Sequence, residues 1–398
     1  MHDVIVIGAG PGGATASRYL AKLGLDVCMI DKDTFPRDKP CGGGFSRNII
    51  ENFPYLKPHA SEFMKGVAKV GVLHSPNREI VLEGQVDMAV TLRIDFDNVL
   101  YEEAVSEGVL PLTGTRAKTA AIKDDGVTVE LSGGKSIRGN VIIGADGVTS
   151  MVARETGLNR RWPSSSVTAC RVCEVPASSH EILDRYTEAL KYHFFANLGG
   201  QPGYGWIFPK QETINIGLGI VGTHSQGLPS KFDAFVGFLL KQDLLPKNPD
   251  LSAARGALVP TAGPIKKTVL DRCILLGDSA GQVSPITGGG ISYAMIAARY
   301  AARVIADSLE EDRTDAESLN LYQRLWQTDF GDDFRNQLLA QRIFTGPFTD
   351  LLFHIGSKDE TIQTMVSESM SEASESDIDV TRLVLRTLKV CLREALHI

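Results

Sequence analysis

Several features that would place this chain in a simple structural class are scarce or absent. No apolar run reaches the ~18 residues that a membrane-spanning helix needs, so no spanning segment is expected. Basic residues are outnumbered: Lys plus Arg total 41, Asp plus Glu total 48, and the formal net charge is −7. This balance predicts no nucleic-acid partner, because it does not attract phosphate backbones. Docking to a membrane surface through apolar side chains stays compatible with it.

Cysteine and histidine form no recognisable framework. The six cysteines are scattered, which excludes a disulfide scaffold and fits a reducing cytoplasm. Cys170 and Cys173 match C-x-x-C, but they lack a partner pair, and strand residues three apart point to opposite faces. The eight histidines show no ligand spacing such as H-E-x-x-H, so no metal site is expected. The apolar strand Val4–Ile7 leaves no room for a signal peptide before it, and we expect a cytoplasmic location.

The apolar pattern predicts two kinds of sheet whose segments alternate along the chain. Val4–Ile7 and Val27–Ile30 are continuous apolar runs, as in parallel strands buried on both faces. Residues 65–92 and 165–221 contain short alternating segments that are typical of antiparallel strands. From residue 315 the pattern is helical, and the acidic stretch from Ser367 to Asp379 is typical of a solvated helix face or a loop.

These segments predict an α/β fold (α+β mixed) in which a Rossmann-like domain is interleaved with an antiparallel-sheet domain. The 398 residues fit about two domains. We expect residues 1–64, 93–164 and 265–312 in the nucleotide domain, 65–92 and 165–264 in the sheet domain, and 313–398 in a C-terminal helical region.

A complete dinucleotide-binding motif opens the chain. Gly8 permits a tight turn after the first strand, Gly10 lets the backbone approach a pyrophosphate, and Gly13 allows close helix–strand packing. The helix N-terminus then faces the phosphates with its free N–H groups. An acid at the end of the next strand binds ribose hydroxyls and favours a cofactor without a 2′-phosphate. The site is predicted to comprise Gly8, Gly10, Gly13, Ala14, Asp31 and Lys32.

Two later strand ends also carry an acid beside a glycine. Asp278 follows Gly277 and either accepts a bond from a ribityl hydroxyl or is an ordinary helix N-cap. Gly288, Gly289 and Gly290 favour the ribityl interpretation of Asp278. The helix that these glycines open can present its N-terminus to a second phosphate or a flavin ring edge. Asp146 is either a structural turn residue or a neighbour of the phosphates. This second group comprises Asp146, Asp278, Gly288, Gly289, Gly290 and Ile291.

Together these pieces resemble the flavoprotein superfamily that contains p-hydroxybenzoate hydroxylase, squalene epoxidase, tryptophan halogenases and geranylgeranyl reductases. Pro40-Cys41-Gly42-Gly43-Gly44 is similar to the Cys-Gly-rich loop of the geranylgeranyl reductases. Arg93-x-x-Phe96-Asp97 resembles the arginine-bearing helix start that contacts FAD in the family. Tyr204-Gly205-Trp206-Ile207-Phe208-Pro209 is similar to the Y-x-W-x-F-P segment that lines their lipid site. The resemblance covers roughly residues 1–345.

The resemblance implies an FAD-dependent reductase that saturates C=C double bonds of geranylgeranyl chains, in archaeal-type membrane lipids or in geranylgeranyl diphosphate. It adds Cys41, Gly42, Gly43 and Arg93 to the FAD-binding residues and makes the antiparallel-sheet domain the substrate domain. The sequence has no second G-x-G-x-x-G unit at a strand-to-helix turn that would bind a nicotinamide, so electrons are expected from an external donor, namely ferredoxin, a deazaflavin or NAD(P)H. A lipid substrate also implies peripheral contact with the inner face of the membrane.

Individual residues keep alternative interpretations. Cys41 is expected either to act on the alkene or the flavin, as the one catalytic candidate, or to be a small apolar filler. Tyr204, Trp206 and Phe208 alternate along a strand, so they share one face. That face is either the wall of a pocket for a long apolar chain or an aromatic ladder in the core. Pro209 ends the strand and is grouped with these substrate-binding residues.

Two other functions remain open at this stage. A flavin monooxygenase or halogenase can use the same scaffold, although a halogenase would carry a second tryptophan where this chain has Tyr204. A non-catalytic prenyl-lipid-binding protein, similar to Rab escort and GDI proteins, can keep the fold without using flavin. The intact glycines and Asp31 favour retained FAD over that alternative.

Overall fold

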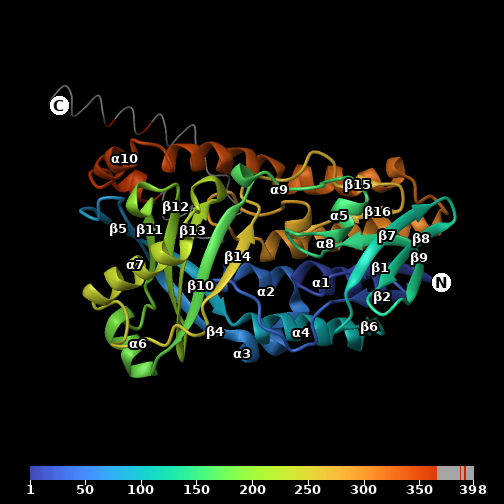
Figure 1. Ribbon diagram of the computed structural model, residues 1–398, viewed down its shortest axis with the longest axis horizontal. Helices are drawn as coiled ribbons and strands as arrows, with labels where there is room; N and C mark the ends of the chain where they lie inside the picture. Colours follow the sequence, from blue (N-terminus) through green and yellow to red (C-terminus); the bar gives the residue numbers. More distant parts are fainter. Residues whose placement is uncertain (365–385, 387–389, 391–398) are drawn as a thin grey trace.

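Residues 1–364, Arg386 and Val390 are described by the computed structural model, and they form two large sheets with helices between and beside them. Sheet A lies at the end of the molecule that holds the N-terminus, and sheet B lies at the opposite end (Figure 1). The long helix α9 (Ala316–Phe344) extends along both sheets (Figure 1).

Sheet A is parallel at its centre. Val4 and Val6 of β1 enter one core cluster, while Ile5 and Ile7 enter another on the opposite face. Burial on both faces explains why β1 is an unbroken apolar run. The path across the sheet is β15 (Val269–Leu270), β16 (Cys273–Leu275), β9 (Ser136–Gly144), β1 (His2–Ile7), β2 (Val27–Ile30) and β6 (Leu110–Leu112), with β8 (Gly126–Leu131) and β7 (Ala117–Lys123) added at β9.

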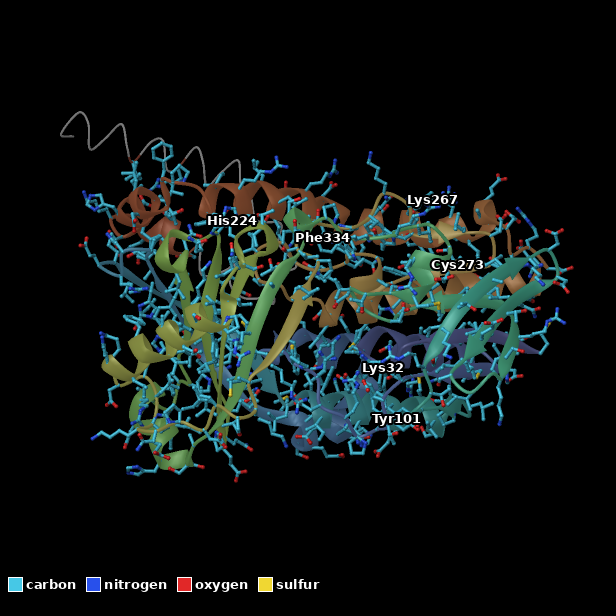
Figure 2. All side chains as sticks on the ribbon, in the orientation of Figure 1. Lys32, Tyr101, His224, Lys267, Cys273 and Phe334 are labelled. Carbon is cyan, nitrogen blue, oxygen red and sulfur yellow. The ribbon has the colours of Figure 1, made fainter. Side chains whose placement is uncertain are left out.

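Helices cover the face of sheet A that carries Val4. α1 (Pro11–Lys22) packs there with α4 (Arg93–Ser106) and α8 (Ile291–Glu310). Phe334 of α9 packs on Tyr293 of α8, with 4.8 Å between ring centroids (Figure 2). The other helices with bounds in residues 1–364 are α2 (Asn48–Asn52), α3 (Ala60–Phe63), α5 (Met151–Glu155), α6 (Ser179–Tyr186), α7 (Leu228–Lys241) and α10 (Thr349–Gly356), with short 3-10 helices η1 (Pro54–His59), η2 (Ser164–Ser166), η3 (Leu198–Gly200), η4 (Gly222–His224) and η5 (Gly277–Ser279).

Sheet B has one face packed under helices and one face turned to a cavity. Ile207 of β12 packs with α6 and α7 residues, whereas Trp206 and Phe208 of the same strand lie in a different cluster on the opposite face. The strand order is β14 (Arg255–Val259), β10 (Thr168–Pro176), β13 (Thr213–Val221), β12 (Gly203–Pro209), β11 (Tyr192–Ala196), β4 (Met64–His74), β5 (Val81–Thr91) and β3 (Gly44–Ser46).

One junction in sheet B differs from the expected antiparallel pattern. β4 and β11 pair in parallel, with Val72 opposite His193, while the other pairs of the sheet are antiparallel. The sheet therefore consists of two antiparallel groups that lie side by side. Because no hairpin connects β4 to β11, nothing in the local sequence sets their relative direction.

A histidine pair lies on the helix-covered face of sheet B, with His193 buried and His74 partly buried. His74 Nε2 lies 3.0 Å from His193 Nδ1, and the His74 ring stacks on Phe195 with 4.2 Å between centroids. Burial lowers the pKa of His74 to about 4 and the pKa of His193 to about 3. Both imidazoles are therefore neutral in the folded protein near pH 7.

The mixed α/β architecture expected from the sequence is confirmed, with sheet A parallel at its centre and sheet B mostly antiparallel. The helix expected to open at the three glycines begins only after them, at Ile291, because Gly288, Gly289 and Gly290 stay in the loop. The domain boundaries stay a prediction, and the acidic stretch from Ser367 to Asp379 lies outside the described residues. Among the described residues, no helix combines the length and apolarity needed to cross a membrane.

Candidate functional site

The glycines at the end of β1 differ in the space around them. A Cβ on Gly13 would lie 1.8 Å from the carbonyl oxygen of Gly8, so α1 can approach β1 only because residue 13 has no side chain. Gly8 has φ +98°, and a Cβ there would lie 2.4 Å from the Ala145 carbonyl oxygen. At Gly10 the nearest atom to an added Cβ is Arg37 Nη2 at 3.7 Å. Gly8 and Gly13 thus serve packing, whereas Gly10 leaves space that a ligand can use.

Asp31 is joined to the same turn. Its Oδ2 accepts a hydrogen bond from Ala9 N at 2.7 Å, and its Oδ1 accepts one from Asp33 N at 2.9 Å. The side chain is buried at the end of β2, so the carboxylate supports the glycine turn directly. Ala14 lies in the first turn of α1 and donates its N–H to the Gly10 carbonyl, whereas Lys32 is exposed (Figure 2).

Asp146 and Asp278, the two other acids at strand ends, have different surroundings. Asp146 Oδ2 accepts hydrogen bonds from Met151 N at 2.6 Å and Val152 N at 3.2 Å, so it caps α5 and does not line the cavity described below. Burial raises the pKa of Asp146, although these N–H donors oppose the rise. Asp278 lies in η5 and does line the cavity, beside Gly290.

A cavity of about 310 Å³ brings most of the predicted residues together. Its walls come from three parts of the chain: the Cys41 loop, the glycine loop before α8, and the free face of sheet B. Gln341 and Phe344 of α9 also reach it. Of the predicted site residues, the cavity is lined by Cys41, Gly42, Gly43, Arg93, Tyr204, Trp206, Phe208, Asp278, Gly288, Gly289, Gly290 and Ile291. The predicted residues outside this lining are Gly8, Gly10, Gly13, Ala14, Asp31, Lys32, Asp146 and Pro209, although Pro11 of the first glycine turn belongs to it.

A charged cluster holds one side of the cavity. Arg93 Nε and Nη2 each donate to Asp97 at 2.6 Å in a bidentate pair, and Arg37 Nη1 lies 2.7 Å from the same carboxylate. Burial disfavours the charge on Arg93, yet the Asp97 carboxylate keeps the Arg93 pKa above its usual value. Burial likewise opposes ionisation of Asp97, but the guanidinium groups hold its pKa below the usual range. The cluster leaves Arg93 as a fixed cation in the cavity wall.

The aromatic side chains of β12 form a continuous wall. Ring centroids lie 5.6 Å apart for Tyr204 and Trp206, and 6.3 Å apart for Trp206 and Phe208. The Tyr204 hydroxyl donates to the Thr287 carbonyl oxygen, which joins the wall to the glycine loop. All three rings line the cavity, so they face open space as well as the core.

The Cys41 loop packs directly on this wall. A Cβ on Gly42 would lie 2.7 Å from Phe208 Cε2, so the loop can approach the ring only with glycine at that position. Gly43, at φ +78°, donates its N–H to Cys41 Sγ at 3.3 Å. Cys41 is thus part of the cavity lining, in a loop that packs beside the aromatic wall.

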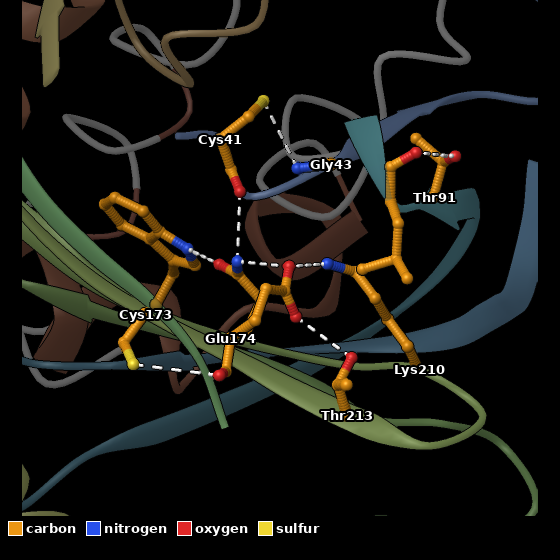
Figure 3. Close-up of polar contacts among 10 residues, drawn as sticks. Cys41, Gly43, Thr91, Cys173, Glu174, Lys210 and Thr213 are labelled. Carbon is orange, nitrogen blue, oxygen red and sulfur yellow. Dashed lines mark hydrogen bonds and ion pairs between the residues drawn. The ribbon is translucent and has the colours of Figure 1, made fainter. Parts of the chain in front are cut away.

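Three functional candidates beneath the loop were missed by reasoning from the sequence. Asn215 of β13 donates to the Cys41 carbonyl at 3.0 Å and to Glu174 Oε1 at 2.7 Å, and it accepts from Trp206 Nε1 at 2.7 Å (Figure 3). Lys210 forms an ion pair with Glu174 (Figure 3). The only local signal is the position of Asn215 between Ile214 and Ile216, where a polar residue interrupts a buried strand.

The C-x-x-C pair does not act as a unit. Cys170 lies in the cluster that faces the cavity, whereas Cys173 lies in the cluster beneath α6 and α7. The two sulfurs are thus on opposite faces of β10, as their spacing predicts. Within the described residues, no group of three or more His, Cys, Asp or Glu side chains is arranged to hold a metal ion.

Comparisons with known proteins identify a family by sequence and a shared fold by structure. A family model described as an FAD binding domain matches residues 1–324. The digeranylgeranylglycerophospholipid reductase of Methanocaldococcus jannaschii is 33% identical over 350 residues, which cover 86% of each chain. A solved geranylgeranyl bacteriochlorophyll reductase-like protein from Thermoplasma acidophilum matches over 99% of both chains, with a TM-score of 0.82 and 23% identity. The halogenase PltM matches 94% of this chain and 85% of its own, at a TM-score of 0.70 and 18% identity.

Proposed function

The chain belongs to the FAD-binding domain family, and we propose that it reduces C=C double bonds in the geranylgeranyl chains of isoprenoid lipids. The family membership confirms the FAD cofactor expected from the glycine motif. One observation carries the proposal: a single cavity places the Cys41 loop and the glycine loop against an apolar aromatic wall. A long hydrocarbon chain fits a wall of that kind, because apolar contact needs no directed polar partners.

The residues present fit FAD. The open space at Gly10 lies beside the α1 N-terminus, and Arg37 Nη2 is close to it, so a pyrophosphate would meet free N–H groups and a cation there. Asp31 and Asp278 are placed at the ends of β2 and near β16, where they would bind hydroxyls of the ribose and the ribityl chain. When bound and reduced, FAD supplies a hydride to one alkene carbon.

Cys41 is our candidate for the proton that the second alkene carbon needs. Its sulfur accepts the Gly43 N–H bond, so the thiol hydrogen is not used in that contact. Hydride on one carbon and a proton on the other complete the saturation of the double bond. Trp206 and Phe208 cover this region with apolar surface, and they would exclude water from the reacting carbons.

Electrons must reach the protein from outside. We propose an external donor of the class of a ferredoxin, a deazaflavin or NAD(P)H, because the chain has one G-x-G-x-x-G unit at a strand-to-helix turn. The second match, Gly217-x-Gly219-x-x-Gly222, lies along and just after strand β13 of sheet B. The donor and the lipid then need not share a site.

We further propose that α10 lies near the inner face of a membrane. Phe348 and Leu351 are 70% and 52% exposed, while Phe344 and Phe353 nearby line the cavity. Exposed apolar side chains beside a lipid cavity fit shallow insertion into a bilayer surface. A Phe348→Ser/Leu351→Ser variant should sediment less with lipid vesicles than the parent protein. Equal sedimentation of the two would contradict this placement.

The test of the function is anaerobic reduction of the purified protein followed by mass spectrometry of an added geranylgeranyl lipid. We expect a gain of two hydrogens for each double bond reduced, with no oxygen consumed. Oxygen-dependent turnover, or incorporation of oxygen or halide into a substrate, would favour a monooxygenase or halogenase instead. Purification of a protein that neither carries nor takes up flavin would favour a prenyl-lipid binder.

A further inference from the structure

A polar cluster is buried beneath the Cys41 loop, where the aromatic wall would otherwise continue into an apolar core. Asn215 is 0% exposed and Lys210 is 1% exposed, while Glu174 is partly buried beside them. Asn215 pairs across the sheet with Glu174 on one side and Phe208 on the other. A buried amide and a buried ammonium need specific partners, because burial without them is strongly unfavourable.

The contacts of Asn215 define the orientation of its amide. The indole N–H of Trp206 can only donate, so the atom that it meets at 2.7 Å must be the amide oxygen. The Cys41 carbonyl and the Glu174 carboxylate can only accept, so the atom that meets both must be the amide nitrogen. One side chain therefore connects the backbone of the Cys41 loop to the indole of the aromatic wall (Figure 3).

Glu174 anchors this amide from below. Its Oε1 accepts from Asn215 and from Lys210, and its Oε2 accepts from the Thr213 hydroxyl at 2.9 Å. The Lys210 side chain is enclosed, so movement away from Glu174 would leave its ammonium group buried without this carboxylate partner. The ion pair thus holds the carboxylate, and the carboxylate holds the amide.

We propose that Asn215 is a positioning residue that fixes the Cys41 loop at a set distance from Trp206, and that the Glu174–Lys210 pair keeps it in place. The role rests on the proposed function, in which Cys41 supplies the proton to the alkene. Asn215 itself does not line the cavity, so it acts through the Cys41 backbone and not on the substrate. Without it, Cys41 Sγ loses its fixed position relative to the wall.

The first test follows the Cys41 thiol and needs no turnover. The other described cysteines are buried, and Cys391 lies outside the described residues, so the experiment uses a Cys391→Ser background. In FAD-loaded protein, Asn215→Ala should raise the rate of Cys41 alkylation by iodoacetamide about tenfold, the effect of losing one well-formed hydrogen bond that holds the loop. Asn215→Asp keeps the side-chain volume and the bond from Trp206, but the new carboxyl group faces Glu174 and shares a proton with it. No N–H remains to donate to the Cys41 carbonyl. This variant should release the loop in the same way.

Thr268→Val is the matched control. Thr268 is also 0% exposed and also accepts an indole N–H bond, from Trp326 at 3.2 Å, but it lies outside the cavity lining. Its loss should lower stability while leaving Cys41 alkylation at the parent rate. If alkylation is equally fast in the Thr268 and Asn215 variants, or unchanged in both Asn215 variants, the positioning role is overturned.

The second test uses steady-state kinetics with the lipid. Asn215→Ala should lower kcat about tenfold with little change in KM, because the lipid wall is intact while the loop is displaced. A rise in KM with unchanged kcat would overturn the proposal. If the parent protein itself reduces no lipid, the proposed function fails, and the alkylation rates still decide whether Asn215 fixes the loop.

Discussion

Replacing Gly10 with alanine should separate FAD binding from folding. Gly10 has φ −72° and ψ −175°, which alanine adopts without strain, and the nearest atom to the new Cβ is 3.7 Å away. The apoprotein should therefore fold normally, and Gly→Ala changes at compatible positions raise stability by about 0.4–1 kcal/mol. The same methyl group occupies the space through which a pyrophosphate would approach the α1 N-terminus.

The loss of FAD affinity can be estimated from the contact removed. A hydrogen bond to a charged group contributes about 1.5–3 kcal/mol, so the Kd should rise roughly 10- to 150-fold. At an FAD concentration of about 100 times the parent Kd, bound ligand stabilises the parent by about 2.7 kcal/mol, whereas a Kd raised about 100-fold leaves about 0.4 kcal/mol. With an unfolding entropy of about 2.1 cal/mol/K per residue, 398 residues convert this difference into a Tm lower by about 3 °C.

Thermal unfolding with and without added FAD, together with flavin absorbance after desalting, measures both effects. Gly237→Ala is the control, because Gly237 lies in α7 with no atom within 4 Å of an added Cβ. It should keep the parent's flavin content and its Tm increase with FAD. Stoichiometric flavin in Gly10→Ala would refute the placement of the pyrophosphate at this turn.

Three further predictions concern the cavity and the histidine pair. Cys41→Ser should retain FAD but slow alkene reduction about 10- to 1,000-fold, because a hydroxyl is a weaker acid than a thiol; unchanged turnover would remove Cys41 from the chemistry. Trp206→Ala should raise KM for long isoprenoid chains more than for short ones, and equal changes would assign Trp206 to core packing alone. The folded-state pKa values of His74 and His193, about 4 and about 3, lie below the unfolded value of about 6.5. The unfolded chain therefore takes up protons first, and the free energy of unfolding should fall as pH drops from about 6.5 toward 4. In denaturant titrations, His74→Phe should reduce the slope of this free energy against pH by up to about 1.4 kcal/mol per pH unit. An identical slope in the variant and the parent would contradict the neutral histidine pair.

The nucleotide half of the site could be predicted because its signals are local. The glycines of the first turn lie between a strand and a helix, and each spacing has a direct steric meaning, such as the 1.8 Å approach at Gly13. The aromatic wall was also predictable in outline, because alternate strand residues share a face. Whether that face meets solvent, a cavity or the core depends on the opposite layer, and no local pattern in β12 encodes it.

The interactions that the sequence did not reveal join distant parts of the chain. Asn215 is 174 positions from Cys41 and 41 positions from Glu174, so their contact exists only after sheet B has formed against the Cys41 loop. The parallel junction between β4 and β11 was hidden for the same reason. Asp146 is a case where a local signal had a structural outcome, since this acid at a strand end accepts hydrogen bonds from the first N–H groups of α5 and does not line the cavity.

The central claim is that electrons pass from reduced flavin to an isoprenoid alkene within the cavity. The most direct measurement is the flavin absorbance of anaerobically reduced protein after a geranylgeranyl lipid is added. We predict that the oxidised flavin spectrum returns without oxygen, in proportion to the double bonds supplied. A flavin that stays reduced until air is admitted would contradict the account.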